Sequence, residues 1–329
     1  MKKNFYITVC STLAVLLTLA TFIAFVDPYQ QYHNRPDKYC GVQRSEISGI
    51  ARRHDFNAFL MGSSMSMNHY PEQADSLWGW NTKNFSIMGA TYDDYEVILP
   101  FVMRQGKAKN VILNVDAFSF ARQRQAVPRH LYDDNYLNDY LYLCNYTSLK
   151  HAINYLLHPS PLKSLYHFNS PVGRQHLLDD FNNKYVNSSY EGEVYDIDAL
   201  ILHFDNSLLK AIADADNDVI WYVYFPPYSI GEFVLLDKYG DLEAFLQWKE
   251  HASSEFLKLP NVKLYDFQVE PWITNLDEYM DVRHHSHSYN RAILETIHSD
   301  SNRVKEPLKT EFSEIYNLIK VYQDSLICQ

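Results

Sequence analysis

The sequence predicts an α/β domain in which helices cover both faces of a parallel sheet of about five strands, preceded by one N-terminal transmembrane helix. Short segments rich in Val, Ile, Leu and aromatic residues alternate with longer stretches of helical periodicity, as in three-layer, doubly wound, flavodoxin-like folds. Several of the short segments are apolar on both faces, which is typical of a parallel sheet covered on both sides. An unbroken apolar run near the N-terminus predicts the transmembrane helix.

The apolar run spans residues 5–26 and is followed by Asp27. Its length is about what a helix needs to cross a bilayer, and Lys2 and Lys3 before it predict a cytoplasmic N-terminus with export of the rest of the chain. A cleaved signal peptide is the alternative, but its apolar region would be shorter and a small-x-small cleavage site would follow it. We therefore expect a single-pass membrane anchor over residues 1–27.

The composition describes a folded, acidic protein. Of its 329 residues 47% are hydrophobic, which is too many for a disordered chain. The net charge of -11 argues against wide contact with nucleic-acid phosphates, which requires a basic face. Cys40, Cys144 and Cys328 have no C-x-x-C spacing, so no zinc knuckle or thiol redox motif is predicted, and one disulfide among them is left open.

Residues 28–55 are polar and rich in turn-forming residues, and we interpret them as a tether that leads into a domain over 56–329. Strands are expected in the apolar segments that begin at Phe56, Asn81, Asn110, Asp218 and Asn261. Helices are expected at 92–105, 196–215, 241–259 and 289–300. Residues 121–195 keep a helical spacing but break the alternation, so we expect a helical insertion after the third strand that lies over the carboxyl edge of the sheet.

The first strand ends in "LMGSSMSMNHY", which brings a serine to the edge where active groups of open α/β sheets gather. Gly62 allows a sharp turn, after which Ser64 can present its hydroxyl at the mouth of the sheet. The G-x-S-x-G elbow of α/β-hydrolases is absent, because Ser66 occupies the place of its second glycine. Serine is a weak nucleophile until a base takes its proton, so a base must come from elsewhere in the chain.

The stretch "DVRHHSHS", residues 281–288, supplies a candidate base. Asp281 precedes His284 by three residues, a spacing at which the carboxylate can hold the imidazole Nδ1–H and favour the imidazolium formed during reaction. A metal site with His284, His285 and His287 as ligands is the alternative. Three neighbours on one loop rarely face one ion, and spaced carboxylate or cysteine partners are not evident. We therefore predict an Asp–His pair and expect His285 and His287 to pack or to line the cleft.

With these residues the chain resembles the SGNH, or GDSL-like, hydrolase superfamily over about residues 56–300. The family's Gly-Asp-Ser block matches "GSS", with Ser63 in the place of the aspartate and Ser64 in the place of the nucleophile. The second block, a glycine whose N–H helps to hold an oxyanion, matches Gly89, and the Asp-x-x-His block matches Asp281 and His284. The resemblance implies a Ser64–His284–Asp281 triad, backbone oxyanion donors at Ser64 and Gly89, and no metal or cofactor.

The third block of the family differs in this chain. The family has Gly-x-Asn-Asp, whose asparagine amide donates to the oxyanion, whereas here the third strand ends in "LNVDAFSF". Asp116 falls at the place of the asparagine and Asn114 at the place of the glycine. An ionised carboxylate would repel a developing oxyanion, and the loss of one donor typically lowers the rate by roughly a hundred- to a thousand-fold. The alternative is a structural role for Asp116, in which it caps a helix or pairs with an arginine such as Arg122.

The flanking segments "YFPPYS", "NVKLYDF" and "HHSHSYNRAIL" are similar to a membrane-anchored bacterial branch of the superfamily. That similarity implies an exported esterase or O-acyltransferase that acts on a surface or secreted polysaccharide, with acetyl as the expected acyl group. It implies a place in the bacterial inner membrane, with the domain in the periplasm or outside the cell, and a membrane-bound O-acyltransferase as a partner. The alternative is a non-catalytic scaffold in an envelope polymer modification complex, which the altered third block favours.

Overall fold

The computed structural model describes residues 2–35, 39–121, 126–157, 172–186, 195–310 and 314–327. These residues contain a five-stranded, all-parallel sheet with the strand order β2-β1-β3-β4-β5. The strands are β1 Ala58–Met61, β2 Thr82–Asn84, β3 Asn110–Asn114, β4 Ile220–Phe225 and β5 Val262–Asp266. Each strand lies within a predicted segment, so the α/β class and the five-stranded sheet are confirmed.

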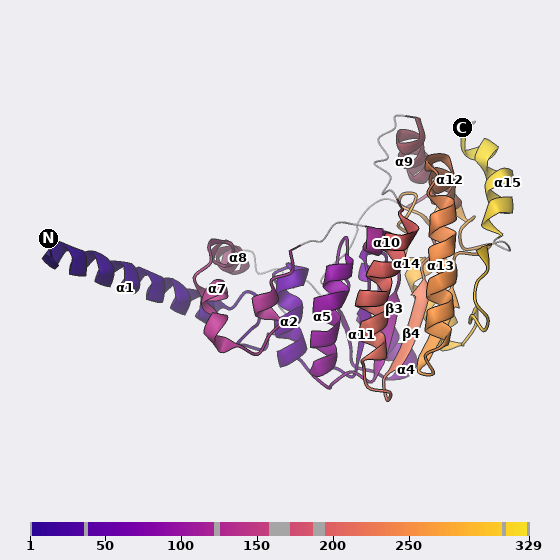
Figure 1. Cartoon of the computed structure of the whole chain (residues 1–329). Coiled ribbons are helices and arrows are strands. Elements are labelled where there is room, and N and C mark those ends of the chain that lie inside the picture. Colours follow the sequence, from indigo (N-terminus) through magenta and orange to yellow (C-terminus); the bar gives the residue numbers. More distant parts are fainter. Residues whose placement is uncertain are drawn as a thin grey trace.

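Apolar side chains cover both faces of the sheet, because successive residues of a strand point to opposite sides. Phe59 and Val111 belong to the larger apolar cluster, and Leu60 and Ile112 belong to a separate one. The larger cluster is completed by helices α2 Gln43–Arg53, α5 Tyr92–Arg104, α10 Ile197–Phe204, α11 Lys210–Ala213, α12 Ile230–Tyr239 and α13 Leu242–Leu257. The smaller cluster is completed by α4 Pro71–Trp78 and α14 His287–His298. In Figure 1 the helices α5, α11 and α13 lie in front of the strands β3 and β4.

The four predicted helices are present as α5, α10 with α11, α13 and α14. A π-helical turn, Asp205–Leu209, joins α10 to α11. The helices α2, α4, α12 and α15 Ile315–Ile327 are additional to the prediction. Because helices follow β1 and β3 on opposite faces, the chain changes face between these two neighbouring strands, which is where open α/β sheets bind ligands.

Helix α1, Lys2–Val26, projects from the domain and is long and apolar enough to cross a membrane (Figure 1). Most of its side chains are exposed, and Ile23 and Val26 near its end are buried against the domain. The predicted N-terminal apolar helix is therefore confirmed as a helix. Its insertion in a membrane and its orientation stay predictions.

The structure differs from the expected tether in residues 28–55. Asp27 is buried, and its carboxylate accepts hydrogen bonds of 2.7–2.9 Å from the backbone N–H groups of Gln31, Tyr32 and His33. Residues 43–53 form α2, which packs on α5 and buries Ile47 and Ile50. The polar composition of this segment reflects hydrogen bonds inside the fold, so most of the segment is part of the domain.

The insertion at 121–195 is divided between two places. Helices α7 Tyr140–Leu143 and α8 Tyr146–Leu157 pack against α1, whereas α9 Arg174–Val186 packs against α12. The predicted position over the carboxyl edge of the sheet therefore fits α9, whereas α7 and α8 lie elsewhere, beside α1. Residues 122–125, 158–171 and 187–194 lie outside the described residues. Cys40 and Cys144 are free thiols, and Cys328 also lies outside the described residues.

The variant Gly49→Ala tests whether residues 28–55 belong to the fold. A Cβ atom at Gly49 would lie 2.6 Å from the Gln30 carbonyl, and this backbone cannot move aside without a shift of the whole segment. We expect the free energy of unfolding of the full chain in detergent to fall by about 3 kcal/mol or more. The control Gly79→Ala has φ of +71° and open space around it, so it should cost only about 1 kcal/mol. Equal stability of Gly49→Ala and the parent protein would mean that the segment is a loose tether.

Candidate active site

Ser64 is the first residue of a short helix that starts directly after β1. This helix, α3 Ser64–Met67, is capped by the side chain of Ser63. Gly62 makes the turn with φ of +151°, and a Cβ atom there would lie 2.6 Å from Asn114. Only glycine fits this position. The turn leaves the side chain of Ser64 half-buried at the carboxyl end of β1.

His284 joins Ser64 to Asp281. Its Nε2 atom lies 2.9 Å from Ser64 Oγ, and its Nδ1 atom lies 2.7 Å from Asp281 Oδ2. When the Nδ1–H donates to the carboxylate, Nε2 is left as an acceptor for the proton of the serine hydroxyl. The structure thus brings the three predicted residues together in the geometry of nucleophile, base and orienting carboxylate.

Asp281 is held as a carboxylate. Its Oδ1 atom accepts the backbone N–H groups of Arg283 at 2.8 Å and His284 at 2.7 Å. Burial raises the pKa of this carboxyl group, but the hydrogen bond to His284, the charge of His284 and the two N–H donors outweigh it, so the pKa lies well below its usual range. An ionised Asp281 favours the imidazolium that forms when His284 takes a proton.

The loop between η4, Leu276–Glu278, and α14 is held by contacts from two other helices. Ser229, the residue before α12, donates its N–H and its hydroxyl to Val282 O at 3.0 and 2.8 Å. Asp180 of α9 accepts the Val282 N–H at 3.1 Å. Arg283 forms an ion pair of 2.6 Å with the buried Glu232 of α12. These contacts fix the loop that carries the histidine, and no pattern in the sequence indicates these pairings.

Two backbone N–H groups are available to hold an oxyanion. Ser64 begins α3, so its N–H has no acceptor inside the helix. Gly89 lies in a turn with φ of +57°. The Ile87 N–H donates to Gly62 O at 2.9 Å, which brings the chain after β2 beside the turn that carries Ser64. Among the described residues neither the Ser64 nor the Gly89 N–H has a hydrogen-bond acceptor. Their convergence on a substrate oxygen stays a prediction.

Asp116 lies in a buried hydrogen-bond network after β3. Its Oδ1 atom accepts the hydroxyl of Tyr228 at 2.5 Å, and its Oδ2 atom accepts the hydroxyl of Ser63. Burial raises the pKa of Asp116, and the two hydroxyl donors oppose that rise. Asn114 is buried too, and its Oδ1 atom accepts the Ser63 N–H at 3.0 Å. Both carboxylate oxygens of Asp116 are therefore occupied, which favours its structural role over a place in an oxyanion hole.

Ser63 and Asp116, at which the resemblance to the superfamily is incomplete, contact each other. Ser63 stands in the place of an aspartate and Asp116 in the place of an asparagine, and the two side chains share a hydrogen bond. The carboxylate of this contact lies on the segment after β3, and the hydroxyl lies on the turn after β1. Tyr228, which follows β4 in "YFPPYS", completes the network. Its position at a strand end was the available signal, and the sequence prediction missed it.

The other histidines of the loop have separate partners. His285 is buried with its Nε2 atom 3.0 Å from Asn290 Oδ1, and burial lowers its pKa to about 4. The ring of His287 lies 5.2 Å from the ring of Tyr70. His285 therefore packs in the core, and the histidines of this loop do not face one point. Within the described part of the chain no three His, Cys, Asp or Glu side chains are arranged to hold a metal ion.

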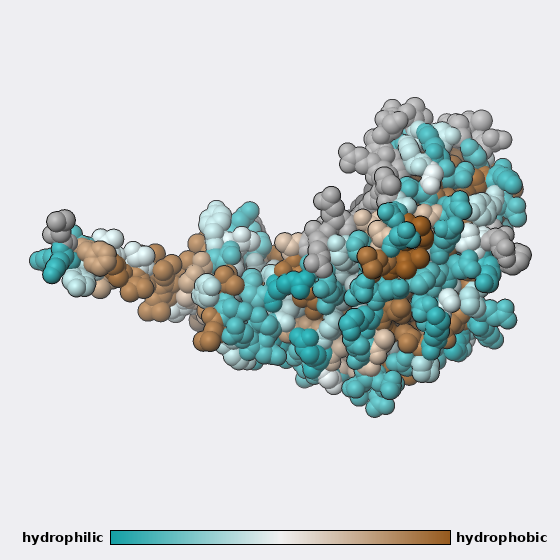
Figure 2. Space-filling view, viewed as in Figure 1, coloured by the Kyte–Doolittle hydropathy of each residue, from teal (hydrophilic) through white to brown (hydrophobic). Residues whose placement is uncertain are grey.

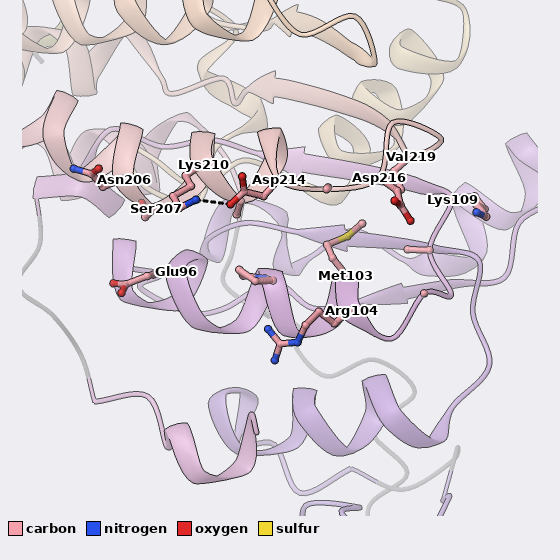
Figure 3. A pocket seen from close by; sticks show the side chains of 15 residues that line it. Glu96, Met103, Arg104, Lys109, Asn206, Ser207, Lys210, Asp214, Asp216 and Val219 are labelled. Atoms are coloured by element: carbon pink, nitrogen blue, oxygen red, sulfur yellow. Dashed lines mark hydrogen bonds and ion pairs between the residues drawn. The ribbon is translucent and has the colours of Figure 1, made fainter. Parts of the chain in front are cut away.

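A pocket of about 460 Å³ lies between α5 and α11 (Figure 3). Lys210 and Asp214 form an ion pair of 2.5 Å on the α11 side. Lys109 and Val219, which precede β3 and β4, also line it, so the pocket is near the amino ends of these strands. Ser64 follows the carboxyl end of β1, and the pocket is therefore separate from the candidate site.

Comparison with models of protein families gives no match, and comparison with curated proteins gives none. The similarity to the SGNH superfamily rests on the Ser64 turn, the Asp281–His284 pair and the glycine after β2. The functional argument therefore starts from the geometry of these residues.

Replacement of Ser63 and Asp116, singly and together, tests the hydrogen bond between these two side chains. Ser63→Asp places a second carboxylate against Asp116, and Asp116→Asn removes an acceptor from a buried hydroxyl. We expect each change to lower the free energy of unfolding by about 1–3 kcal/mol. In the double variant a carboxylate again faces a neutral group. Its loss of unfolding free energy should therefore be smaller than the sum of the losses in the two single variants, by about 1 kcal/mol or more. Urea denaturation of the four proteins gives this coupling energy.

Turnover of an ester by the same proteins separates the two roles of Asp116. The network predicts that Asp116→Asn lowers stability and leaves turnover per folded molecule unchanged. A gain in turnover would place the side chain of Asp116 in the oxyanion hole. Additive losses of stability in the double variant would contradict a direct contact between Ser63 and Asp116.

Proposed function

We propose that this chain is a membrane-anchored serine esterase or O-acyltransferase of SGNH type that acts on acyl groups, with acetyl as the leading candidate, of a surface or secreted polysaccharide. The observation that carries the proposal is the continuous hydrogen-bonded chain from Ser64 through His284 to Asp281. Its members come from the carboxyl end of β1 and from the loop before α14, at the sheet edge where open α/β sheets place their active groups.

The reaction follows from the arrangement of the three side chains. Ser64 Oγ attacks the ester carbonyl carbon while His284 Nε2 takes the hydroxyl proton, and Asp281 stabilises the imidazolium. The tetrahedral intermediate then loses the alcohol, which receives the proton from His284, and an acyl group remains on Ser64. A water molecule or a sugar hydroxyl attacks this acyl group next and gives up its proton to His284. The bond between the acyl carbon and Ser64 Oγ then breaks, and His284 returns the proton to Ser64 Oγ. Water gives an esterase, and a sugar hydroxyl gives a transferase.

The oxyanion in this reaction would be held by the backbone N–H groups of Ser64 and Gly89. Asp116 would support the turn that carries Ser64 through its hydrogen bond to Ser63. With backbone donors alone, we expect slow turnover of simple esters, since each missing donor costs roughly a hundred- to a thousand-fold.

The length and apolarity of α1 and the lysine pair before the apolar run support anchorage in the bacterial inner membrane with the domain outside the cytoplasm. A membrane-bound O-acyltransferase is the proposed partner, because an external transferase needs an acyl group carried across the membrane. No cofactor is proposed, since the acyl transfer uses only the side chains of the triad.

A non-catalytic scaffold in an envelope polymer assembly is the second candidate. The altered third block favours it, because Asp116 replaces the residue that donates to the oxyanion in the resembled family. The Ser64–His284 hydrogen bond favours the enzyme, since a scaffold has no need of an aligned base and nucleophile.

Hydrolysis of a small acetyl ester by the full chain in detergent tests the proposal. Ser64→Ala should lower the rate by at least about a thousand-fold, because removal of the nucleophile removes the covalent pathway. The matched control is Ser76→Ala, whose hydroxyl is exposed on α4 and donates to Gln73 O, and it should leave the rate unchanged. Equal rates for Ser64→Ala and the parent protein, or no hydrolysis by the folded parent, would favour the scaffold.

A further inference from the structure

A second feature of the molecule lies where α1 enters the domain. Three short segments of the insertion surround this point, and together we call them the membrane-proximal platform: η2 Tyr136–Asn138, α7 Tyr140–Leu143 and α8 Tyr146–Leu157. Helices α7 and α8 both pack against α1. The platform and α1 are thus one packed unit, although more than a hundred residues separate them in the sequence.

The junction between α1 and the platform is rigid. Arg35 donates to Val26 O at 2.6 Å and to Phe25 O at 2.9 Å, which satisfies carbonyl groups at the end of α1. Its guanidinium group also lies 5.7 Å from the ring centre of Tyr155 in α8. Asp27, the residue after α1, accepts the hydroxyl of Tyr142 in α7 at 2.9 Å. These contacts fix the position of the platform relative to α1.

The platform carries most of the exposed apolar side chains of the domain. Outside α1, twelve large apolar side chains of the described residues are exposed, and eight of them lie on the platform. These eight are Tyr136, Leu137, Tyr140, Leu141, Tyr146, Ile153, Leu156 and Leu157. Leu137 is 88% exposed and Leu157 67% exposed, so they are not partly covered core residues. Figure 2 shows apolar residues along α1 and at the end of the domain from which it projects.

Helix α8 has two apolar sides. Ala152 and Tyr155 are buried in a cluster with Val26 of α1. Tyr146, Ile153 and Leu157 are spaced seven and four residues apart, so they form one stripe on the helix surface together with Lys150, and all four are exposed. The first side explains how α8 packs on α1. The exposed stripe needs a second apolar environment, which the described part of the domain does not supply.

We propose that the platform lies in the interface of the same membrane that α1 spans, with its exposed stripe among the lipid headgroups and upper acyl chains. This inference rests on the membrane anchorage proposed above. The continuity with α1 favours lipid over a protein partner, because the contact with α1 holds the platform next to the end of a membrane-spanning segment. In Figure 1 α8 is seen end-on while α1 runs across the view, so α8 lies across α1, as a helix in the membrane plane would.

The composition of the platform also suits a lipid interface. Tyrosine is enriched where membrane and water meet, because its ring is apolar and its hydroxyl is polar, and three of the exposed side chains are tyrosines. Leucine and isoleucine supply the apolar area that drives an amphipathic helix into the headgroup region. Two attachments, α1 and the platform, would then fix both the height and the rotation of the domain on the membrane.

Site-directed fluorescence in vesicles tests the inference on the full chain. The native cysteines are replaced by serine, and one cysteine is introduced at Ile153, Leu157, Leu202 or Leu16 and labelled with a small environment-sensitive fluorophore. Vesicles of phosphatidylethanolamine and phosphatidylglycerol are prepared without a spin label, with a lipid that carries a spin label near its headgroup, and with a lipid that carries one near the end of an acyl chain. Leu202 is the matched control, because it is an exposed leucine, 58% accessible, on α10 and away from the platform. Leu16 reports on α1.

We expect the labels at 153 and 157 to shift their emission to the blue and to lose emission in vesicles with the lipid that carries the headgroup spin label, while the label at 202 does neither. Loss of emission at 16 without loss at 153 and 157 would contradict the proposed position of the platform in the membrane interface and would leave the proposed anchor intact. Absence of quenching at 16 by the lipid with the acyl-chain spin label would overturn the anchor and the platform together. Since positions 153, 157 and 202 are exposed, these labels do not disturb the core.

Discussion

The hydrogen bond between Ser64 Oγ and His284 Nε2 joins segments that are 220 residues apart, and the candidate site depends on it. Neither side chain reaches the other by local structure. Ser64 is placed by a glycine turn at the end of β1, and His284 by a loop that Ser229 and Asp180 hold through Val282. The parallel sheet makes this meeting possible, because all of its strands present their carboxyl ends at one edge.

A second set of contacts at the same edge supports the turn that carries Ser64. Asp116 is a buried acid, and burial of an unpaired charge is costly. Hydroxyl groups of Ser63 and Tyr228 satisfy its two oxygens, and Ser63 in turn caps the helix that begins with Ser64. The network therefore connects β1, β3 and the segment after β4 directly behind the turn that carries Ser64. A carboxylate in this position supports the backbone and is not available as a hydrogen-bond donor while it is ionised.

The strands and the triad could be predicted because each has a local signal. Strands β1 to β5 are short apolar runs, and the Gly-Ser-Ser and Asp-x-x-His patterns carry their chemistry within a few residues. Helix α4 also had signals, with Pro71 in its first turn and Gly79 at its end, and these were overlooked.

Helix α2 could not be found in this way, because its polar residues are used inside the protein. Arg44 forms a partly buried ion pair of 2.7 Å with Asp94, and Glu46 accepts the N–H groups of Gly41 and Val42 at 2.7 and 3.0 Å. In the sequence these polar residues have the composition of a solvent-exposed linker. Their structural role depends on partners that are brought close only by the fold. The contacts of Asp180, Glu232 and Tyr228 with the site are hidden for the same reason.

Covalent labelling of the full chain with a fluorophosphonate tests the central claim most directly, since such reagents phosphonylate a serine only when a neighbouring base activates it. Intact mass followed by peptide mapping identifies the modified residue, and the same reaction is followed for His284→Ala and Ser64→Ala. The account predicts an adduct on Ser64 in the parent protein, a much slower reaction in His284→Ala and no adduct at this position in Ser64→Ala. Absence of an adduct on Ser64 in folded parent protein, or an equal rate in His284→Ala, would contradict it.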